Sequence, residues 1–288
     1  MYFPKWFVRP FAAPYVAGET LKSALDTVRE LNQDGFCATL DILGEHVQSE
    51  AESFKIRDAY INLFQSIKKA GLDSNVSLKP THLGLGINYN LALKNLLAIL
   101  NTAKETDNFM RIDMENSDYT DATINAYQEC YTEYNQVGPV FQAYMKRTGD
   151  DISELNTAED FNCRICKGIY RESPNIAFQD REAIRTNFIK ATQALLTGPG
   201  YVGIATHDIT LIDTLETWIR ENDIPKTRFE FQVLYGVPMG DRLKKLLEVG
   251  YKVRVYVPCG EAWFDYAIRR LKENPNILWY ILGNIFKR

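Results

Sequence analysis

The sequence is poor in the features that mark nucleic-acid-binding, disulfide-bonded and membrane-spanning proteins. Its 37 acidic residues outnumber its 33 basic ones, for a net charge of −4, and no basic cluster marks a nucleic-acid surface. Five cysteines in 288 residues are too few for a disulfide framework, so we expect a reduced, cytoplasmic compartment. We expect no signal peptide. No run reaches the roughly eighteen apolar residues that a spanning helix needs.

Motifs for metals and for two common nucleotide-binding loops are also missing. The three histidines, His46, His82 and His207, lie far apart without an H-x-H or H-E-x-x-H spacing, so we expect no metal site. The glycine pattern that begins at Gly84 lacks the third glycine of a dinucleotide-binding loop, because position 89 is tyrosine. No phosphate-binding G-x-x-x-x-G-K-S/T motif occurs either.

Two remaining features are ambiguous. Cys163 and Cys166 have the spacing of a redox or metal pair, but residues three apart in a strand point to opposite faces, so we do not expect such a pair. The apolar tail at 277–282 is too short to span a bilayer. It is suited either to contact with a membrane surface or, the reading we favour, to a buried cap on the rest of the fold.

Short apolar runs alternate with longer segments of helical period along the chain. The eight candidate strands are 36–43, 75–79, 109–114, 138–144, 161–167, 201–206, 229–235 and 251–257. Strands separated by helices form parallel sheets, and eight such units in about 250 residues favour a closed barrel. The sequence therefore predicts an α/β fold, a single-domain (β/α)8 barrel. It divides into an N-terminal segment and helix at 1–35, eight βα units at 36–260, and a C-terminal helix and tail at 261–288.

Polar residues recur in and after these strands, where a barrel of this kind carries its active site. They are Lys79, Asp113, Glu115, Gln142, Tyr144, Arg164, Lys167, Thr206, His207, Asp208, Glu230, Gln232, Arg254 and Tyr256. A single residue of this kind is usually a surface group. Recurrence on six or more strands predicts a site, although spacing alone does not say which one.

The last helix carries Tyr266, Arg270 and Glu273 at i, i+4 and i+7, hence on one face, with Arg269 beside them. Paired arginines suit a carboxylate ligand, because each guanidinium donates two parallel hydrogen bonds. The alternative, favoured on this helix alone, is a solvated face on which Arg269 pairs with Glu273.

Two functional alternatives come from the residues themselves. Lys79 or Lys167 could form a Schiff base, because a desolvated lysine is a good nucleophile, and the chain would then be a barrel lyase or aldolase. The second alternative is a degenerate barrel that serves only as a binding or scaffold protein.

Taken together, the segments resemble the proline dehydrogenase family along nearly the whole chain. The resemblance rests on the order of short motifs at 16–20 (VAGET), 39–44 (TLDILG), 77–79 (SLK), 111–114 (RIDM), 164–170 (RICKGIY), 205–207 (ATH), 229–236 (FEFQVLYG), 255–260 (VYVPCG) and 266–274 (YxxRRLxEN). It implies a distorted (β/α)8 barrel that binds FAD and oxidises L-proline to Δ1-pyrroline-5-carboxylate, the first step of proline catabolism. Hydride would pass from proline C5 to flavin N5, and electrons would go on to a quinone. The chain looks monofunctional, and peripheral contact at the inner face of a membrane is implied.

The resemblance also implies roles for individual residues. Those assigned to the substrate are Arg269, Arg270 and Lys79 on the carboxylate, Tyr256 near the ring, Asp113 orienting Tyr256 and the basic groups, Tyr266 at the pocket wall, and Glu273 pairing with an arginine. Those assigned to the flavin are Arg164 near N5, Gln142 at the pyrimidine side, Met114 and Leu234 on the ring, and Lys167, Gly168, Thr206 and His207 along the remainder of FAD.

One departure from the family pattern affects this set: Pro80 follows Lys79 where the family usually has an apolar residue, and it could shift the Lys79 backbone. Tyr256 is retained. Because the extra hydroxyl of hydroxyproline would crowd its ring, we expect proline to be the preferred substrate.

Overall fold

The computed structural model describes residues 15–264, 266 and 268. Within this part, eight parallel strands close into a barrel in sequence order, β1 to β8, and β1 pairs with β8 from Cys37 opposite Arg254 to Ile42 opposite Cys259. The strands are β1 (Cys37–Ile42), β2 (Ser74–Leu78), β3 (Met110–Ile112), β4 (Val137–Gln142), β5 (Asn162–Cys166), β6 (Tyr201–Ala205), β7 (Phe229–Leu234) and β8 (Val253–Cys259). The predicted (β/α)8 barrel is confirmed.

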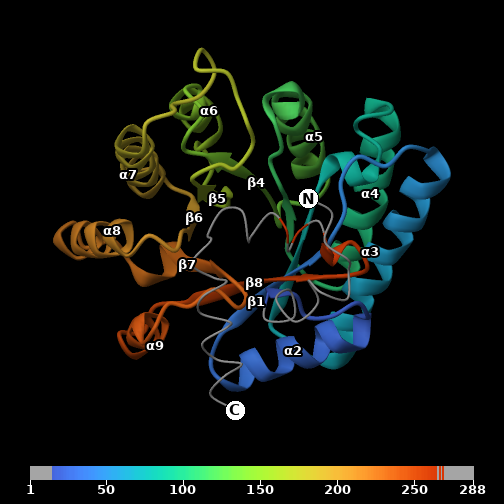
Figure 1. Ribbon diagram of the computed structural model, residues 1–288, viewed down its shortest axis with the longest axis horizontal. Coiled ribbons are helices and arrows are strands. Elements are labelled where there is room, and N and C mark those ends of the chain that lie inside the picture. Colours follow the sequence, from blue (N-terminus) through green and yellow to red (C-terminus); the bar gives the residue numbers. More distant parts are fainter. Residues whose placement is uncertain (1–14, 265, 267, 269–288) are drawn as a thin grey trace.

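Helices surround the strands in a ring, with α2 beside β1 and β8 (Figure 1). The α-helices are α2 (Leu21–Gln33), α3 (Glu50–Ala70), α4 (Tyr89–Glu105), α5 (Thr120–Glu133), α6 (Thr148–Leu155), α7 (Arg181–Thr197), α8 (Ile209–Glu221) and α9 (Arg242–Glu248). Short 3-10 helices are η2 (Pro80–Leu83), η3 (Ser117–Tyr119) and η4 (Lys226–Arg228).

The longest of these helices shows how local sequence sets its ends. The side chain of Ser49 accepts a hydrogen bond from the Glu52 amide at the start of α3, and two glutamates occupy the first turn, where the helix dipole favours negative charge. At the other end Gly71 takes a left-handed conformation, with φ 61°, which glycine adopts without steric cost. The helix therefore begins and ends where the sequence provides a cap.

Strand boundaries differ from the predictions by a few residues, and the largest shift is at β8. It begins at Val253 rather than at 251, because the Tyr251 amide is bonded to the Leu246 carbonyl in the turn that ends α9. This turn contains Gly250 at φ 86°, as expected for a glycine-terminated helix. The apolar pattern of the sequence continues across the turn, so pattern alone placed the strand too early.

Side chains alternate along each strand between two buried layers. One set faces the helices and is apolar, as in Leu40 of β1, Ile112 of β3 and Phe231 of β7, all of which belong to the main hydrophobic core. The other set points into the barrel, and much of it is polar. Tyr256 on β8 is hydrogen-bonded to Asp113 at the end of β3, and these strands are not neighbours in the sheet, so the bond crosses the barrel interior.

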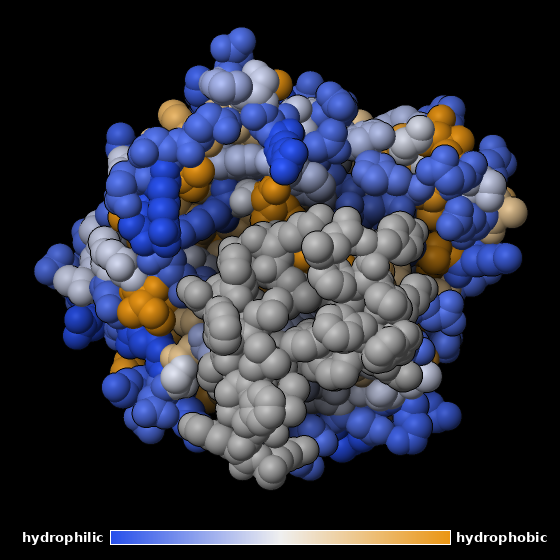
Figure 2. Space-filling model, in the orientation of Figure 1, coloured by the Kyte–Doolittle hydropathy of each residue, from blue (hydrophilic) through white to orange (hydrophobic). Residues whose placement is uncertain are grey.

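The outer surface is unremarkable by comparison. Figure 2 shows that the described part of one face is mostly hydrophilic, with scattered hydrophobic spots. Among the described residues, no helix combines the length and the hydropathy needed to cross a bilayer.

Candidate active site

A large cavity opens at the C-terminal ends of the strands, with a volume of about 1330 Å³. Every predicted site residue that the structure describes lines it: Lys79, Asp113, Met114, Gln142, Arg164, Lys167, Gly168, Thr206, His207, Leu234, Tyr256 and Tyr266. The remaining three, Arg269, Arg270 and Glu273, lie outside the described residues. The chain therefore brings its predicted residues to one place, while their individual roles remain predictions.

Asp113 is the centre of the hydrogen-bond network in this cavity. One carboxylate oxygen, Oδ1, accepts from Ser77 Oγ at 2.6 Å and from Arg164 Nη1 at 2.8 Å, and the other accepts from the Tyr256 hydroxyl at 2.9 Å. Burial alone would raise the pKa of Asp113, but Arg164 and the Lys79 ammonium, 4.0 Å away, lower it. The carboxylate is therefore ionised and holds three side chains in fixed positions.

Lys79 is paired with a second buried carboxylate, Asp41 at the end of β1. Their Nζ and Oδ2 atoms are 2.8 Å apart, and the Asp41 side chain is only 1% exposed. Burial would lower the pKa of Lys79, but Asp41 and Asp113 outweigh it and raise the pKa above its ordinary value. Pro80 begins η2, and Lys79 before it is extended, as a residue preceding proline prefers. Its side chain lines the cavity in this arrangement.

Arg164 is held in three ways. Its Nη1 bonds to Asp113, its Nε donates to Gln232 Oε1 at 2.6 Å, and its guanidinium carbon lies 5.1 Å from the centre of the Tyr256 ring. The third nitrogen, Nη2, is buried without a hydrogen-bond partner among the described residues. A buried donor without a partner is costly, so this nitrogen marks a position where a ligand acceptor would be stabilised.

A cluster of charged side chains lies on the other flank of the cavity. Asp208 accepts from Lys167 Nζ at 2.6 Å and from Arg185 Nε at 2.7 Å. Burial would raise the pKa of Asp208, but these two partners lower it to about 2. Arg185 is also paired with Glu182 at 2.5 Å, so two carboxylates balance the two cations of this cluster. Lys167 is the cation of the cluster that lines the cavity, where it is placed to contact a phosphate-bearing ligand.

Two further predicted residues have strict local requirements. Gly168 has φ +100°, and an added Cβ would lie 2.2 Å from the Tyr144 ring, so only glycine fits. His207 Nε2 accepts from the Leu234 amide at 2.8 Å, which requires Nε2 to be the unprotonated nitrogen of this ring. Both residues shape the wall rather than supply mobile charge.

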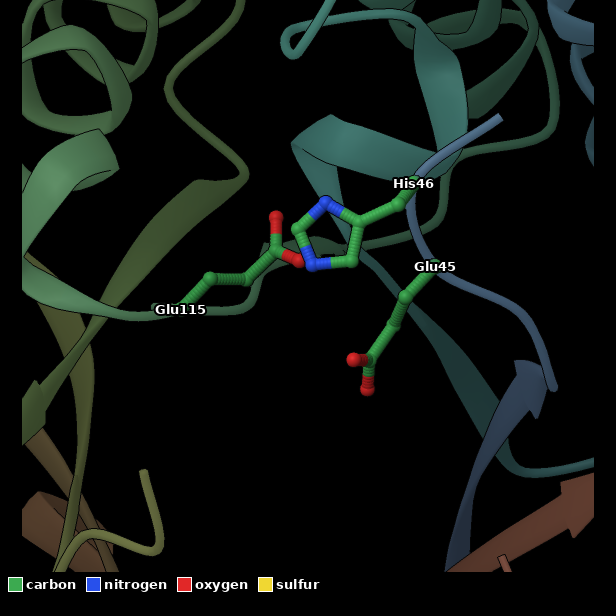
Figure 3. A group of neighbouring side chains, drawn as sticks. All are labelled: Glu45, His46 and Glu115. Carbon is green, nitrogen blue, oxygen red and sulfur yellow. The ribbon is translucent and has the colours of Figure 1, made fainter. Parts of the chain in front are cut away.

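At the rim, Glu45, His46 and Glu115 form a group with ligand atoms within 4.8 Å of one another. Figure 3 shows the Glu115 carboxylate facing the His46 ring, with Glu45 beside them. Glu115 also accepts from the Thr81 amide at 2.9 Å and from its hydroxyl at 2.5 Å. Carboxylates and imidazole are compatible with several divalent cations, so the spacing of the histidines in the sequence does not decide the question. The absence of a metal site stays a prediction.

Two predictions about polar residues need correction. Glu230 and Arg254 were grouped with the strand ends that carry the site, but they lie early in β7 and β8 and line a second cavity of about 490 Å³. Its walls are the segments that precede the strands, so it is at the opposite end of the barrel. Both side chains face the barrel interior, but each is the second residue of its strand, so it lies far from the C-terminal end that carries the candidate site.

Asp41 is the functional candidate that sequence reasoning missed. It lies within the motif at 39–44, but an acidic residue in an apolar strand has no obvious partner until the fold brings Lys79 next to it. A lone aspartate inside a strand of otherwise apolar residues was the available signal, because a buried carboxylate requires a partner.

A closed (β/α)8 barrel with charged side chains gathered in one cavity at its C-terminal end defines an enzyme of the barrel class. Comparison with known proteins specifies it. The family model described as "Proline dehydrogenase" matches residues 24–278. "Proline dehydrogenase 1" of Bacillus subtilis (strain 168) is 39% identical over 277 residues, covering 96% of this chain and 91% of the relative. The "Proline dehydrogenase" of Deinococcus radiodurans is 34% identical, with 96% and 90% covered. The chain belongs to the proline dehydrogenase family, whose members are flavin-dependent oxidoreductases.

A solved structure supports the same fold. Proline utilization A from Bdellovibrio bacteriovorus superposes with a TM-score of 0.85 at 24% identity, covering 94% of this chain and 33% of the other. The present chain thus spans about a third of that longer protein, and the likeness concerns the barrel.

Proposed function

We propose that this protein oxidises L-proline to Δ1-pyrroline-5-carboxylate, with FAD bound in the large cavity and electrons passed to a quinone. The observation that carries the proposal is that one cavity contains both the buried cation Lys79 and the Arg164 guanidinium, which has an unpartnered nitrogen. The first group suits the carboxylate of an amino acid, and the second suits an acceptor atom on a cofactor.

The cavity fits a flavin nucleotide in size and in chemistry. Its volume of about 1330 Å³ exceeds the roughly 300–1,000 Å³ typical of pockets for small ligands, which leaves room for a dinucleotide and a substrate. Arg164 supplies the buried unpartnered donor, and Lys167 and Arg181, which line the cavity, supply cationic side chains for a diphosphate. When bound, the flavin provides the hydride acceptor for proline oxidation.

The chain's own residues supply orientation. We assign the proline carboxylate to Lys79, which its raised pKa keeps positively charged, and to Arg269 and Arg270. Tyr256, fixed by its bond to Asp113, packs against the ring. Correct placement of two reacting groups is worth up to about 7–11 kcal/mol of barrier, so a rigid network of this kind is a plausible source of catalysis.

The lysine-centred alternative is disfavoured by the charges around both candidates. A Schiff-base lysine needs a lowered pKa to be nucleophilic, and the carboxylates beside Lys79 raise it. Lys167 is engaged with Asp208 at 2.6 Å. Borohydride trapping of a carbonyl compound on either lysine would restore this alternative.

The rim of the cavity bears on the electron acceptor and on the location of the protein. Ile169 and Ile209 line the cavity and are 51% and 41% exposed, so its rim is apolar at two points where a quinone would approach. We propose peripheral contact with the inner face of a membrane, which co-sedimentation with lipid vesicles would test.

The decisive experiment is an anaerobic absorbance spectrum of the purified protein before and after addition of L-proline. We expect a flavin band that bleaches with L-proline and persists with D-proline. A protein that stays colourless after incubation with FAD would overturn the proposal. A flavin that L-proline does not reduce would refute the substrate while leaving the cofactor.

A further inference from the structure

A continuous chain of hydrogen bonds leads from Arg164 away from the active-site cavity and through the barrel. Arg164 Nε donates to Gln232 Oε1 at 2.6 Å, and Gln232 Nε2 donates to Glu230 Oε1 at 2.6 Å. The same Glu230 oxygen accepts from Arg254 Nε at 2.6 Å. All four residues are at most 6% exposed. A buried chain of this kind is little weakened by water.

The direction of every bond in this chain is determined by chemistry. A guanidinium can only donate hydrogen bonds and an ionised carboxylate can only accept them. The Gln232 amide lies between one of each, so its oxygen must face Arg164 and its nitrogen must face Glu230. The amide therefore has a single possible orientation.

The far end of the chain is firmly anchored. Arg254 Nη1 donates to the Ala38 carbonyl at 2.6 Å, and the second oxygen of Glu230 accepts from the Tyr201 hydroxyl at 3.0 Å. Burial would raise the pKa of Glu230, but Arg254 lowers it to about 2. Glu230 is thus charged at all ordinary pH values, and its bonds to Arg254 and Gln232 are of the stronger, charge-assisted kind.

We propose that Gln232, anchored by Glu230, is a positioning residue for Arg164. A guanidinium is planar, so its bonds at Nε to Gln232 and at Nη1 to Asp113 together fix the plane of the group. They thereby set the direction of the remaining nitrogen, Nη2. This inference rests on the proposed function, in which Arg164 lies next to the flavin. A cation in that place would favour the reduced, anionic flavin.

Gln232→Met tests the role, because methionine has a similar length but no hydrogen-bonding amide. The holoenzyme should retain its flavin while kcat falls about 10- to 100-fold, the range typical of removing groups that orient metal ligands. KM for L-proline should change far less. The midpoint potential of the bound flavin should become more negative, because a misplaced cation stabilises the reduced form less.

Thr39→Val is the matched control. Thr39 is fully buried in the barrel and donates to Asn75 Oδ1 at 2.5 Å, but it has no bond to the Arg164 chain. It should keep the kcat and the flavin potential of the unmodified protein. Equal losses in Thr39→Val and Gln232→Met would show a general effect of barrel polarity and overturn the proposal.

Gln232→Glu provides a second readout should the methionine variant fail to fold. Its carboxyl would face Glu230, and two adjacent carboxyls share a proton at low pH. Only the protonated form can donate to Glu230 as the amide does. The ratio of its kcat to that of the unmodified protein should rise as pH falls, and a ratio independent of pH would contradict the proposal. An unmodified protein without proline-reducible flavin would refute the proposed function instead.

Discussion

The two buried layers of this barrel are built from the same strands yet have opposite characters. Residues that face the helices are apolar and form one continuous core. Residues that face the barrel axis include three arginines, two carboxylates and two glutamines, all buried: Arg111, Arg164, Arg254, Asp41, Glu230, Gln142 and Gln232. In most barrels the interior is filled mainly by branched apolar side chains. Here most branched apolar side chains of the strands lie instead in the layer that faces the helices.

The difference separates stability from chemistry on the two sides of one sheet. Burial of an apolar side chain stabilises the fold by about 1.5–3 kcal/mol. Buried ion pairs add little net stability, because their attraction mainly offsets the cost of removing charges from water. The polar interior therefore serves mainly to position the charged side chains of the candidate site, and the outer layer supplies most of the stability of the barrel.

The largest expected effect comes from the apolar layer. Phe188 on α7 is fully buried in the main core, and Phe188→Ala should lower the free energy of unfolding by about 3–5 kcal/mol. The kcat per folded molecule should be unchanged. Denaturant unfolding with activity corrected for folded fraction checks both. A specific loss of kcat would show that the two layers are not independent.

A somewhat smaller effect on stability is expected from His82. This residue lines the active-site cavity, so its effect would show that a cavity residue also contributes to the stability of the fold. Burial and the charge of Lys79 lower the pKa of His82 to about 4. Between its ordinary pKa of about 6.5 and pH 4, the unfolded state binds a proton that the folded state does not. The free energy of unfolding therefore decreases as the pH falls through this range, by up to about 3 kcal/mol.

His82→Gln should remove this part of the acid sensitivity. The measurement is unfolding free energy against pH for both proteins, and the two curves should diverge only below about pH 6.5. Parallel curves would mean that His82 titrates normally in the folded protein.

Asp41→Asn tests whether a polar residue of the barrel interior affects substrate binding. Without its partner, Lys79 should shift toward Asp113, now 4.0 Å away, and misplace the cation that we assign to the proline carboxylate. KM for L-proline should rise about tenfold, equivalent to about 1.4 kcal/mol, with flavin content retained. Steady-state kinetics decide the point, and a lowered KM would show instead that Asp41 restrains the charge of Lys79.

The smallest expected effect comes from a helix cap that lies in neither buried layer. Ser49 caps α3 on the surface of the barrel, and Ser49→Ala should cost about 1 kcal/mol of stability without a change in kcat or KM. Thermal unfolding with parallel kinetics tests this. Any change in proline kinetics would mean that the loop containing Glu45 and His46 depends on the cap.

Much of the fold was predictable because hydrophobic periodicity and strand length are local properties. All eight strands were predicted within a few residues, and the largest shift came from the turn at Gly250. The barrel interior was less accessible. The segment from Phe229 to Leu234 alternates clearly, but alternation does not say which set of side chains meets which partner across a closed barrel.

The candidate site shows the same division. Lys79, Asp113 and Arg164 were among the polar residues that recur at strand ends, but their roles came from the family resemblance, since each looks like an ordinary strand-end charge in isolation. Their connection through Asp41 and Gln232 depends on contacts between residues tens of positions apart, which only the closed sheet defines. The roles of Arg269, Arg270 and Glu273 stay predictions.

The seam between β1 and β8 has a consequence for how the molecule is made. It joins Ala38 to Arg254, residues 216 positions apart, so the sheet cannot close until β8 has left the ribosome. Until then the outer edges of β1 and β7 expose unpaired backbone groups, which are prone to pair with other chains. A chain that stalls before β8 should therefore aggregate rather than wait as a stable partial barrel, and the cell's chaperones would meet this protein chiefly as an open sheet.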